Sequence, residues 1–167
     1  MAQDVIGMDA GSAAAMVGLI GLFNGGGRFI WSTVSDYIGR GRMYALFFLM
    51  EMVAFWQLGN TRDIFLFQAM IFLITSCSGG GFSVMPAYLT DLFGTRLLGA
   101  VHGRMLTAWA AAGIVGPMLV SWLRAQTGGY TVPLLFFAGC FVLNFIIALV
   151  LQRFGIARAA ARFHAAA

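Results

Sequence analysis

Five apolar runs, each long enough to cross a membrane, constrain the fold of this chain more than any other feature. They cover roughly residues 12–34, 43–59, 64–89, 103–123 and 132–152. A membrane-spanning helix needs about 20 mainly apolar residues. The runs are continuous and lack the polar–apolar alternation that a membrane β-barrel requires. We therefore expect an all-α membrane protein with about five transmembrane helices.

The arginines in the connecting segments are distributed unevenly, and this distribution predicts the orientation of the chain. If the N-terminus lies outside, Arg62 and Arg124 fall on the outer side. The inner side then holds Arg40, Arg42, Arg96, Arg104, Arg153, Arg158 and Arg162. Because cytoplasmic loops are enriched in basic residues, we expect a multi-pass protein of the cell inner membrane, with its N-terminus outside and its C-terminus in the cytoplasm.

The same boundaries divide the chain into a helical bundle, residues 1–152, and a basic cytoplasmic tail, residues 153–167. The tail is compatible with a short basic amphipathic helix that lies near anionic headgroups. We favour the alternative, in which the tail is a frayed and solvated end.

Several functional classes are disfavoured by the composition. The arginines are scattered between apolar runs, which argues against a nucleic-acid partner. Cys77 and Cys140 lie inside apolar runs without a Cys-x-x-Cys motif, so we expect small buried hydrophobes rather than a metal or cofactor site. Ser83 follows Gly81-Phe82, as in some membrane-protease motifs, but a serine nucleophile needs a base at the same depth. We expect no enzyme activity and no catalytic residues.

Two stretches carry most of the remaining polar residues. The first is FNGGGRFIWSTVSDYIGRGR, residues 23–42, and the second is PAYLTDLFGTRLLGAVHGRMLTAWAAAGIVGP, residues 86–117. The glycine triplets in the first and third spans either let helices pack closely or loosen a helix so that its backbone faces a cavity. The packing role is the simpler of the two.

These stretches resemble the major facilitator superfamily of transporters. The first is similar to a core helix followed by the cytoplasmic D-x-x-G-R-x-R loop motif of that family. The second resembles the oxalate/formate antiporter-like branch, which has a similar P-x-x-x-x-D-L-F-G run followed by A-x-G-x-x-G-P. The family fold has twelve helices in two pseudo-symmetric halves. The resemblance implies that this chain corresponds to helices eight to twelve, part of the C-terminal half.

Arg28 is the most informative residue of the first stretch. It lies inside the first apolar run, where an arginine costs about 2.5–3.5 kcal/mol. Its side chain either snorkels toward the inner surface or lines a substrate path, where a guanidinium binds a carboxylate through two parallel hydrogen bonds. The resemblance supports the second interpretation, because the antiporter-like branch uses an arginine here for its carboxylate substrate. Asn24 is a further candidate substrate-binding residue.

Trp109 stands where the oxalate transporters of that branch have a lysine. Two cations suit a dicarboxylate, whereas one cation beside an indole suits a monocarboxylate or a substrate with an apolar part. The alternative is ordinary packing. Oxalate itself is therefore less favoured than the wider class of small carboxylates.

Glu51 is the only acid well inside a span. It lies at a depth similar to that of Arg28 on the next helix, so it either neutralises Arg28 or titrates as a proton-coupling site. The resemblance offers a third interpretation, because the family places its ninth helix at the periphery of the bundle, where Glu51 is structural or faces lipid.

Four residues, Asp36, Gly39, Arg40 and Arg42, form the expected cytoplasmic loop. They are either a plain positive-inside anchor or a gate, in which the arginines pair with acids that approach in one conformation only. The resemblance favours the gate. Asp91 with Arg96 is expected to play a related part at the next cytoplasmic loop.

Together these features predict a secondary transporter of a small carboxylate that works by alternating access, in which one half rocks against the other. The alternative is a truncated or split-gene fragment that is inactive alone and needs a separate N-terminal half. The expected partners are the carboxylate substrate, the lipid bilayer and that possible first half.

Overall fold

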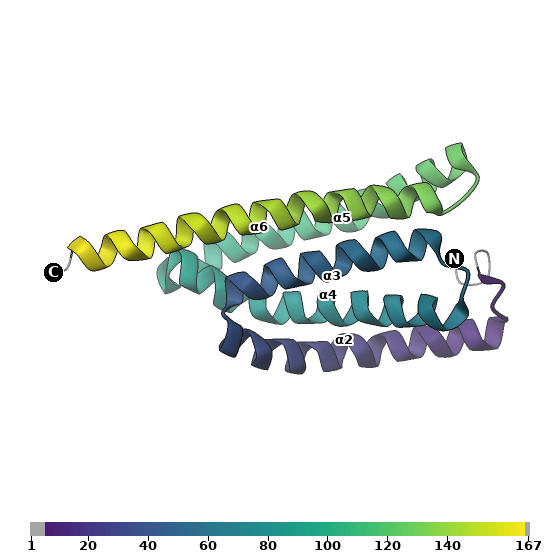
Figure 1. Ribbon diagram of the computed structural model, residues 1–167, viewed down its shortest axis with the longest axis horizontal. Coiled ribbons are helices and arrows are strands. Elements are labelled where there is room, and N and C mark those ends of the chain that lie inside the picture. The colour runs from purple at the N-terminus through teal and green to yellow at the C-terminus, as the bar shows by residue number, and fades with distance from the viewer. Residues whose placement is uncertain (1–5, 166–167) are drawn as a thin grey trace.

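The computed structural model describes residues 6–165, and the side chains of residues 6–154. Five long helices run along the long axis of the molecule (Figure 1). They are α2 (Ala10–Ile38), α3 (Arg40–Asn60), α4 (Ile64–Phe93), α5 (Leu98–Thr127) and α6 (Thr131–Ala165). A short 3₁₀ turn, η1 (Thr95–Leu97), precedes α5. The expected all-helical fold is confirmed, and each helix extends beyond the apolar run that predicted it.

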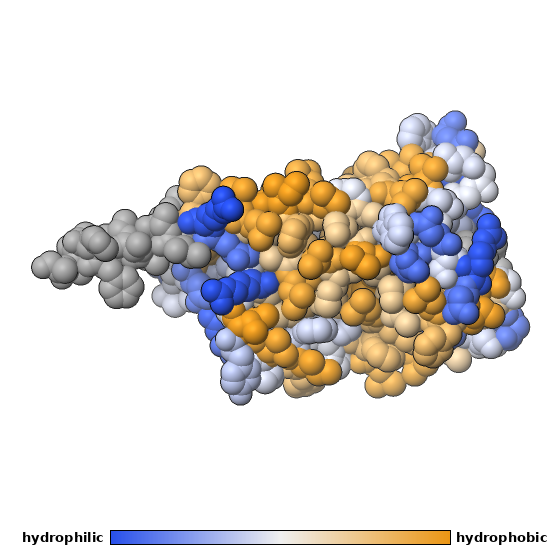
Figure 2. Space-filling model, in the orientation of Figure 1, coloured by the Kyte–Doolittle hydropathy of each residue, from blue (hydrophilic) through white to orange (hydrophobic). Residues whose placement is uncertain are grey.

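Four of these helical segments are long and apolar enough to cross a membrane. They cover Ala10–Ile38, Ile64–Phe93, Thr95–Thr127 and Thr131–Phe154. Apolar side chains form a belt between two hydrophilic ends (Figure 2). The helix α3 is not among the four; besides Arg40 and Arg42 at its start, it contains the polar residues Glu51, Gln57 and Asn60. In the chain it follows α2 and precedes α4, joined to them by Gly39 and by residues 61–63, and it runs alongside α4, so it covers the same depth (Figure 1).

The closest helix pairs are not neighbours in sequence. The helix α2 contacts α4, and α3 contacts α6, far more extensively than α2 contacts α3. The buried stripe of α3 faces its neighbours with Met43, Ala45, Phe47, Glu51, Ala54 and Leu58. Because α4 and α6 both cover α3, the least apolar helix is also well shielded from lipid.

The contact between α2 and α4 depends on glycines that face backbone. A Cβ atom on Gly27 would overlap the carbonyl oxygen of Ser76, and one on Gly79 would overlap that of Asn24. A Cβ on Gly80 would lie 2.6 Å from the side chain of Trp31. Small residues allow membrane helices to approach in this way. The alternative of a loosened helix is wrong, since α2 and α4 are continuous through both glycine triplets.

Hydrogen bonds reinforce the same contact. The Trp31 indole donates to Ser76 Oγ at 2.8 Å, and the hydroxyls of Ser32 and Ser83 are 2.7 Å apart. We call this combination of glycines and hydroxyls the α2–α4 seam; it consists of Gly27, Trp31, Ser32, Ser76, Gly79, Gly80 and Ser83. Lipid offers no hydrophobic force between helices, so close packing and hydrogen bonds must hold this pair together.

The C-terminal tail differs from our expectation. The helix α6 continues to Ala165, so the backbone is helical where we favoured a frayed end from residue 153. The side chains of Arg158 and Arg162 lie outside the described residues. Alanine and arginine, which are frequent there, are strong helix formers, so the helix that begins in the membrane is readily continued.

The seam predicts unequal effects of two alanine substitutions in the same glycine triplet. In Gly79→Ala, the new methyl group meets the Asn24 carbonyl, so α2 must move away from α4. We expect a loss of about 1–3 kcal/mol, or roughly 2–4 °C in Tm for each kcal/mol. Gly81→Ala is the matched control, because nothing lies within 4 Å of a Cβ there. Thermal unfolding in detergent gives both values, and equal Tm values for the two variants would contradict a close α2–α4 contact.

Candidate functional site

The structure brings Arg28 and Trp109 to the same level of the bundle through residues of α4. The hydroxyl of Ser83 donates to the backbone oxygen of Arg28 at 3.2 Å, which sets Arg28 beside this part of α4. The adjacent Phe82 ring contacts Trp109 of α5 edge to face, with ring centroids 5.5 Å apart. Both Arg28 and Trp109 are exposed, Trp109 at 64%. Arg28, Phe82 and Trp109 thus lie on three helices, α2, α4 and α5.

Arg28 and Glu51 are not paired. No ion pair joins them among the residues that the structure describes, and the limited contact between α2 and α3 explains why. Glu51 lies instead on the buried stripe of α3, with 9% of its surface exposed, near Cys77 of α4. Its position is about 16 Å along α3 from Arg40. Of the alternatives for Glu51, neutralisation of Arg28 does not occur in this conformation, and the burial of Glu51 excludes a lipid-facing position.

Asn24 has a packing contact in this structure. Its amide nitrogen donates to the backbone oxygen of Thr75 at 3.3 Å, and its own backbone oxygen faces Gly79. The side chain is only half-buried. Asn24 thus stands beside the α2–α4 seam, one helical turn from Arg28.

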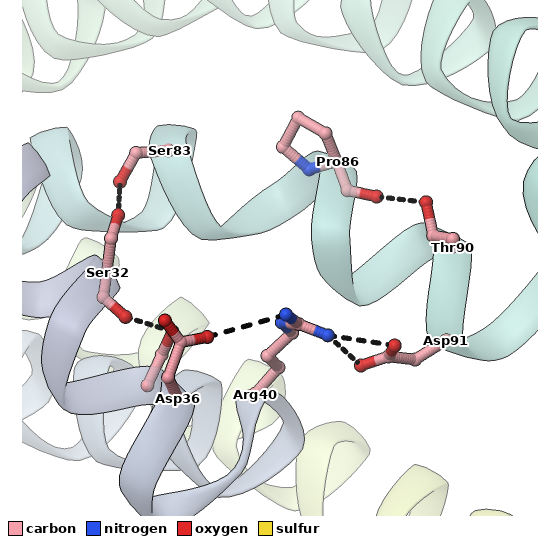
Figure 3. Close-up of polar contacts among 8 residues, drawn as sticks. Ser32, Asp36, Arg40, Ser83, Pro86, Thr90 and Asp91 are labelled. Atoms are coloured by element: carbon pink, nitrogen blue, oxygen red, sulfur yellow. Dashed lines mark hydrogen bonds and ion pairs between the residues drawn. The ribbon is translucent and has the colours of Figure 1, made fainter.

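Three charged residues converge at the other notable site, at the end of the bundle where α2 passes into α3. Arg40 Nη1 donates to both carboxylate oxygens of Asp91 on α4, at 2.9 and 2.8 Å. Its Nη2 lies 3.4 Å from Asp36 Oδ1 on α2. Figure 3 shows the guanidinium of Arg40 between the two carboxylates. We call these three residues the Arg40 latch.

Local backbone geometry positions this latch. Gly39 has φ 90°, which glycine adopts without strain, and it turns the chain from α2 directly into α3. The start of α3 is fixed on two sides: Tyr44 donates to the Gly81 oxygen at 2.6 Å, and Gln152 of α6 donates to the Gly41 oxygen at 2.9 Å. Arg40 is therefore held within reach of both acids.

The latch remains partly open to water. The side chain of Arg40 is 32% exposed, and those of Asp36 and Asp91 are 66% and 50% exposed. The hydrogen bond that Arg40 donates to Asp91 raises the pKa of Arg40, which precedes the expected span of α3, so this guanidinium stays charged at any physiological pH. An ion pair in this setting contributes little to stability and is easily exchanged.

Not every arginine of the two expected cytoplasmic loops takes part in the Arg40 latch. Arg42 is exposed and forms no ion pair in the described part of the chain, although it lies in the same motif. Arg96 lies in the turn η1 and is likewise exposed. Phe82 was not predicted as a neighbour of Trp109, because an aromatic residue beside a glycine triplet carries no distinctive pattern.

Comparison with known proteins gives two findings. Residues 1–162 match the family model described as Major Facilitator Superfamily. The chain is also similar to a protein named oxalate:formate antiporter from Oxalobacter formigenes, at 29% identity over 153 residues. That alignment covers 90% of this chain but 36% of the relative, so the chain spans little more than a third of the relative's length. No solved structure matches the chain significantly.

The Arg40 latch predicts two unequal coupling energies. A double-mutant cycle between Arg40→Gln and Asp91→Asn should give a coupling free energy of at most about 1 kcal/mol, reduced by added salt. The cycle between Arg40→Gln and Asp36→Asn should give less than half of that, because a single contact at 3.4 Å joins those residues. Denaturant unfolding in detergent measures both cycles, with Arg42→Gln as the control. Equal coupling in the two cycles would show that the two-oxygen contact with Asp91 does not dominate.

Proposed function

The chain belongs to the Major Facilitator Superfamily, a family of membrane transporters rather than enzymes, and on this premise we propose that it serves the secondary transport of a small carboxylate ion. It is a multi-pass membrane protein. The observation that carries the proposal is an arginine exposed in the middle of a membrane-length helix, at the level of an aromatic pair. The name of the Oxalobacter relative points to the same class of substrate.

Arg28 is the proposed anchor for the carboxylate. It lies about 15 Å along α2 from Ile38, too deep for an arginine without an anionic partner to be favourable. None of the ion pairs in the described chain includes it. A guanidinium stays protonated and binds both oxygens of a carboxylate, so a substrate anion is the partner that best accounts for its position.

Trp109 and Phe82 are the proposed apolar wall of the same site. An edge-to-face aromatic pair offers a rigid surface for the carbon skeleton of a substrate. A single cation with such a wall favours a monocarboxylate over oxalate, although a formate-like or oxalate-like ion stays within the proposal. Asn24, close to Arg28 on α2, contributes an amide oxygen and nitrogen that could turn toward a substrate.

The Arg40 latch is the proposed gate. Asp36, Gly39, Arg40 and Asp91 hold α2, α3 and α4 together at one end, and Arg42 provides positive charge beside them. By the distribution of arginines, this end faces the cytoplasm of a cell whose inner membrane holds the protein, with the N-terminus outside. In alternating access the latch would open when the bundle rocks.

A second candidate is a chain without transport activity of its own, which must assemble with a separate N-terminal half. The length of the relative supports it, since 36% of that protein is covered. So does α5, which has no buried residue anywhere between Leu98 and Thr127. In this second candidate the chain corresponds to helices eight to twelve of the family fold. Arg28 and Trp109 would then line the surface that contacts the separate N-terminal half.

Uptake of labelled carboxylates by proteoliposomes tests the proposal. We expect formate, acetate or oxalate uptake to fall at least tenfold in Arg28→Gln, because one charge-assisted contact is lost. The matched control is Arg42→Gln, at the exposed start of α3. Trp109→Lys should shift the preference toward oxalate by supplying a second cation.

The same assay separates the two candidates. Uptake by this chain alone supports the transporter. Uptake that requires a co-expressed protein of about seven spans supports the two-part assembly. No carboxylate uptake in either preparation, or equal uptake by wild type and Arg28→Gln, contradicts carboxylate transport.

Glu51 is the proposed proton-coupling residue. It is a buried acid in the middle of α3, without an ion pair or hydrogen bond to other described residues, and such an acid is favourable in a membrane only when it carries a proton. Glu51→Gln mimics the protonated form. We expect it to remove the pH dependence of uptake while uptake itself continues, with Asp63→Asn at the end of the bundle as the control. Unchanged pH dependence would leave Glu51 with a structural role only.

A further inference from the structure

Cys77 is a buried residue that neither the proposed substrate site nor the proposed gate uses. It lies in the middle of α4, is 1% exposed, and its thiol is free. It belongs to the same apolar cluster as Met43 and Phe47 of α3. Glu51 follows Phe47 by one turn on the buried stripe of α3, and its carboxylate interacts electrostatically with Cys77. A thiol and a carboxyl group from neighbouring helices thus share one buried region.

The carboxyl group of Glu51 lacks a polar partner in this region. Only 9% of Glu51 is exposed, and no hydrogen bond or ion pair joins it to another residue in the described part of the chain. The backbone N–H groups around it are bonded within the continuous helices α3 and α4. A buried carboxylate without a donor is costly. When Glu51 gives up its proton, it therefore needs a donor from a side chain that already lies beside it.

Most other ionisable groups of the helices around α3 are too far from Glu51 to serve. Those at or near the helix ends lie about 13 Å or more along the helices from the level of Glu51; they are Asp36, Arg40, Arg42, Asp63, Tyr88, Asp91 and Arg153. Tyr44 lies two turns from Glu51, and its hydroxyl donates to the Gly81 oxygen. Arg28 is exposed on α2, and no ion pair joins it to Glu51 among the described residues. Cys77 is therefore the best placed donor on these helices.

The second cysteine of the chain provides a comparison at a similar depth. Cys140 of α6 is next to Phe141, whose ring stacks on that of Phe55 with centroids 5.2 Å apart. Phe55 follows Glu51 by one turn of α3. Unlike Cys77, Cys140 is only half-buried. A cysteine at the right depth on another helix thus separates the effect of a thiol in general from the effect of Cys77.

The chemistry of a thiol suits a group that must both release and regain a proton. A thiol is a weak hydrogen-bond donor, and a hydrogen bond to the ionised form of a group favours that form. A weak donor stabilises the Glu51 carboxylate only slightly, so the carboxyl group readily takes its proton back. Cys77 is also next to Ser76, whose hydroxyl accepts from Trp31 in the α2–α4 seam. The protonation of Glu51 is thus set beside the contact that positions Arg28.

We propose that Cys77 is a positioning residue for Glu51: its thiol is the donor available to the Glu51 carboxylate, and it sets the pH at which Glu51 releases its proton. The thiol keeps its own proton, and the proton of Glu51 exchanges with water. For its part in transport, the proposal rests on Glu51 as the proton-coupling residue. The interaction itself is measurable without transport.

Infrared spectroscopy of the full chain in lipid nanodiscs measures the protonation of Glu51 directly. The carbonyl stretch of the protonated carboxyl group disappears as the pH rises, and subtraction of the Glu51→Gln spectrum isolates it. We expect Cys77→Ser to move the midpoint to lower pH by about one unit, a tenfold change in proton affinity, because a hydroxyl is a stronger donor. Cys77→Ala removes the donor and should move the midpoint to higher pH. Cys140→Ser and Cys140→Ala are the matched controls and should leave it unchanged.

The directions of these shifts decide the proposal. Opposite shifts in the two Cys77 variants, without a shift in the Cys140 variants, support it. A midpoint that is equal in wild type and in the Cys77 variants overturns it. A shift in the same direction in both Cys77 variants also overturns it, because altered packing alone would produce that result. If Cys77→Ser does not fold, Cys77→Ala decides alone: a shift to higher pH supports the proposal, and no shift overturns it.

Uptake of labelled carboxylates by the same variants tests the proposed coupling separately. If Glu51 couples transport to protons, the pH dependence of uptake should shift together with the carbonyl band. A shifted carbonyl band with uptake that does not depend on pH upholds the role of Cys77 and contradicts proton coupling by Glu51. A carbonyl band that titrates in none of the chains overturns the role of Cys77.

Discussion

The close approach of α2 to α4 is the contact on which the candidate site depends. Gly27 and Gly79 let the two backbones meet. Hydrogen bonds between Trp31 and Ser76 and between Ser32 and Ser83 join the same two helices. Because the helices are in register, Ser83 reaches the backbone of Arg28, and Asp36 and Asp91 arrive on either side of Arg40 (Figure 3). Larger residues at either glycine would separate the helices and both sites would lose their geometry.

The bilayer explains why charged residues occur where they do. Most lie at the two ends of the helices, outside the apolar belt (Figure 2). Arg28 and Glu51 are the exceptions, and their surroundings differ. Glu51 is buried among helices, whereas Arg28 is exposed on the surface of the bundle. A buried acid without a neighbouring cation favours its protonated form. An exposed arginine deep in the membrane favours an anionic partner. These two requirements underlie the proposed coupling and the proposed substrate site.

The sequence was sufficient for the helices and for the loop motif, because both are local. Apolar runs of membrane length predicted five helices, and Asp36 to Arg42 were recognised by their resemblance to the loop motif of the family. The pairing of α2 with α4 is not local, so the contact of Arg40 with Asp91 was expected only as a general possibility. One interpretation of Glu51, a pair with Arg28, rested on depth alone, and no ion pair joins these two described residues; Glu51 lies instead on the buried stripe of α3, near Cys77 of α4. Depth follows from residue number, whereas the rotation of a helix depends on packing.

Fluorine NMR of the chain labelled with 5-fluorotryptophan is the most direct test of the central claim that Arg28 and Trp109 form one carboxylate site. The chain has four tryptophans, so the spectrum is simple, and Trp109→Phe assigns the resonance. A titration with formate or oxalate should shift the Trp109 resonance, leave that of Trp56 unchanged, and have no effect on Trp109 in the Arg28→Gln variant. A Trp109 resonance that ignores the carboxylate, or that shifts equally without Arg28, would contradict the claim.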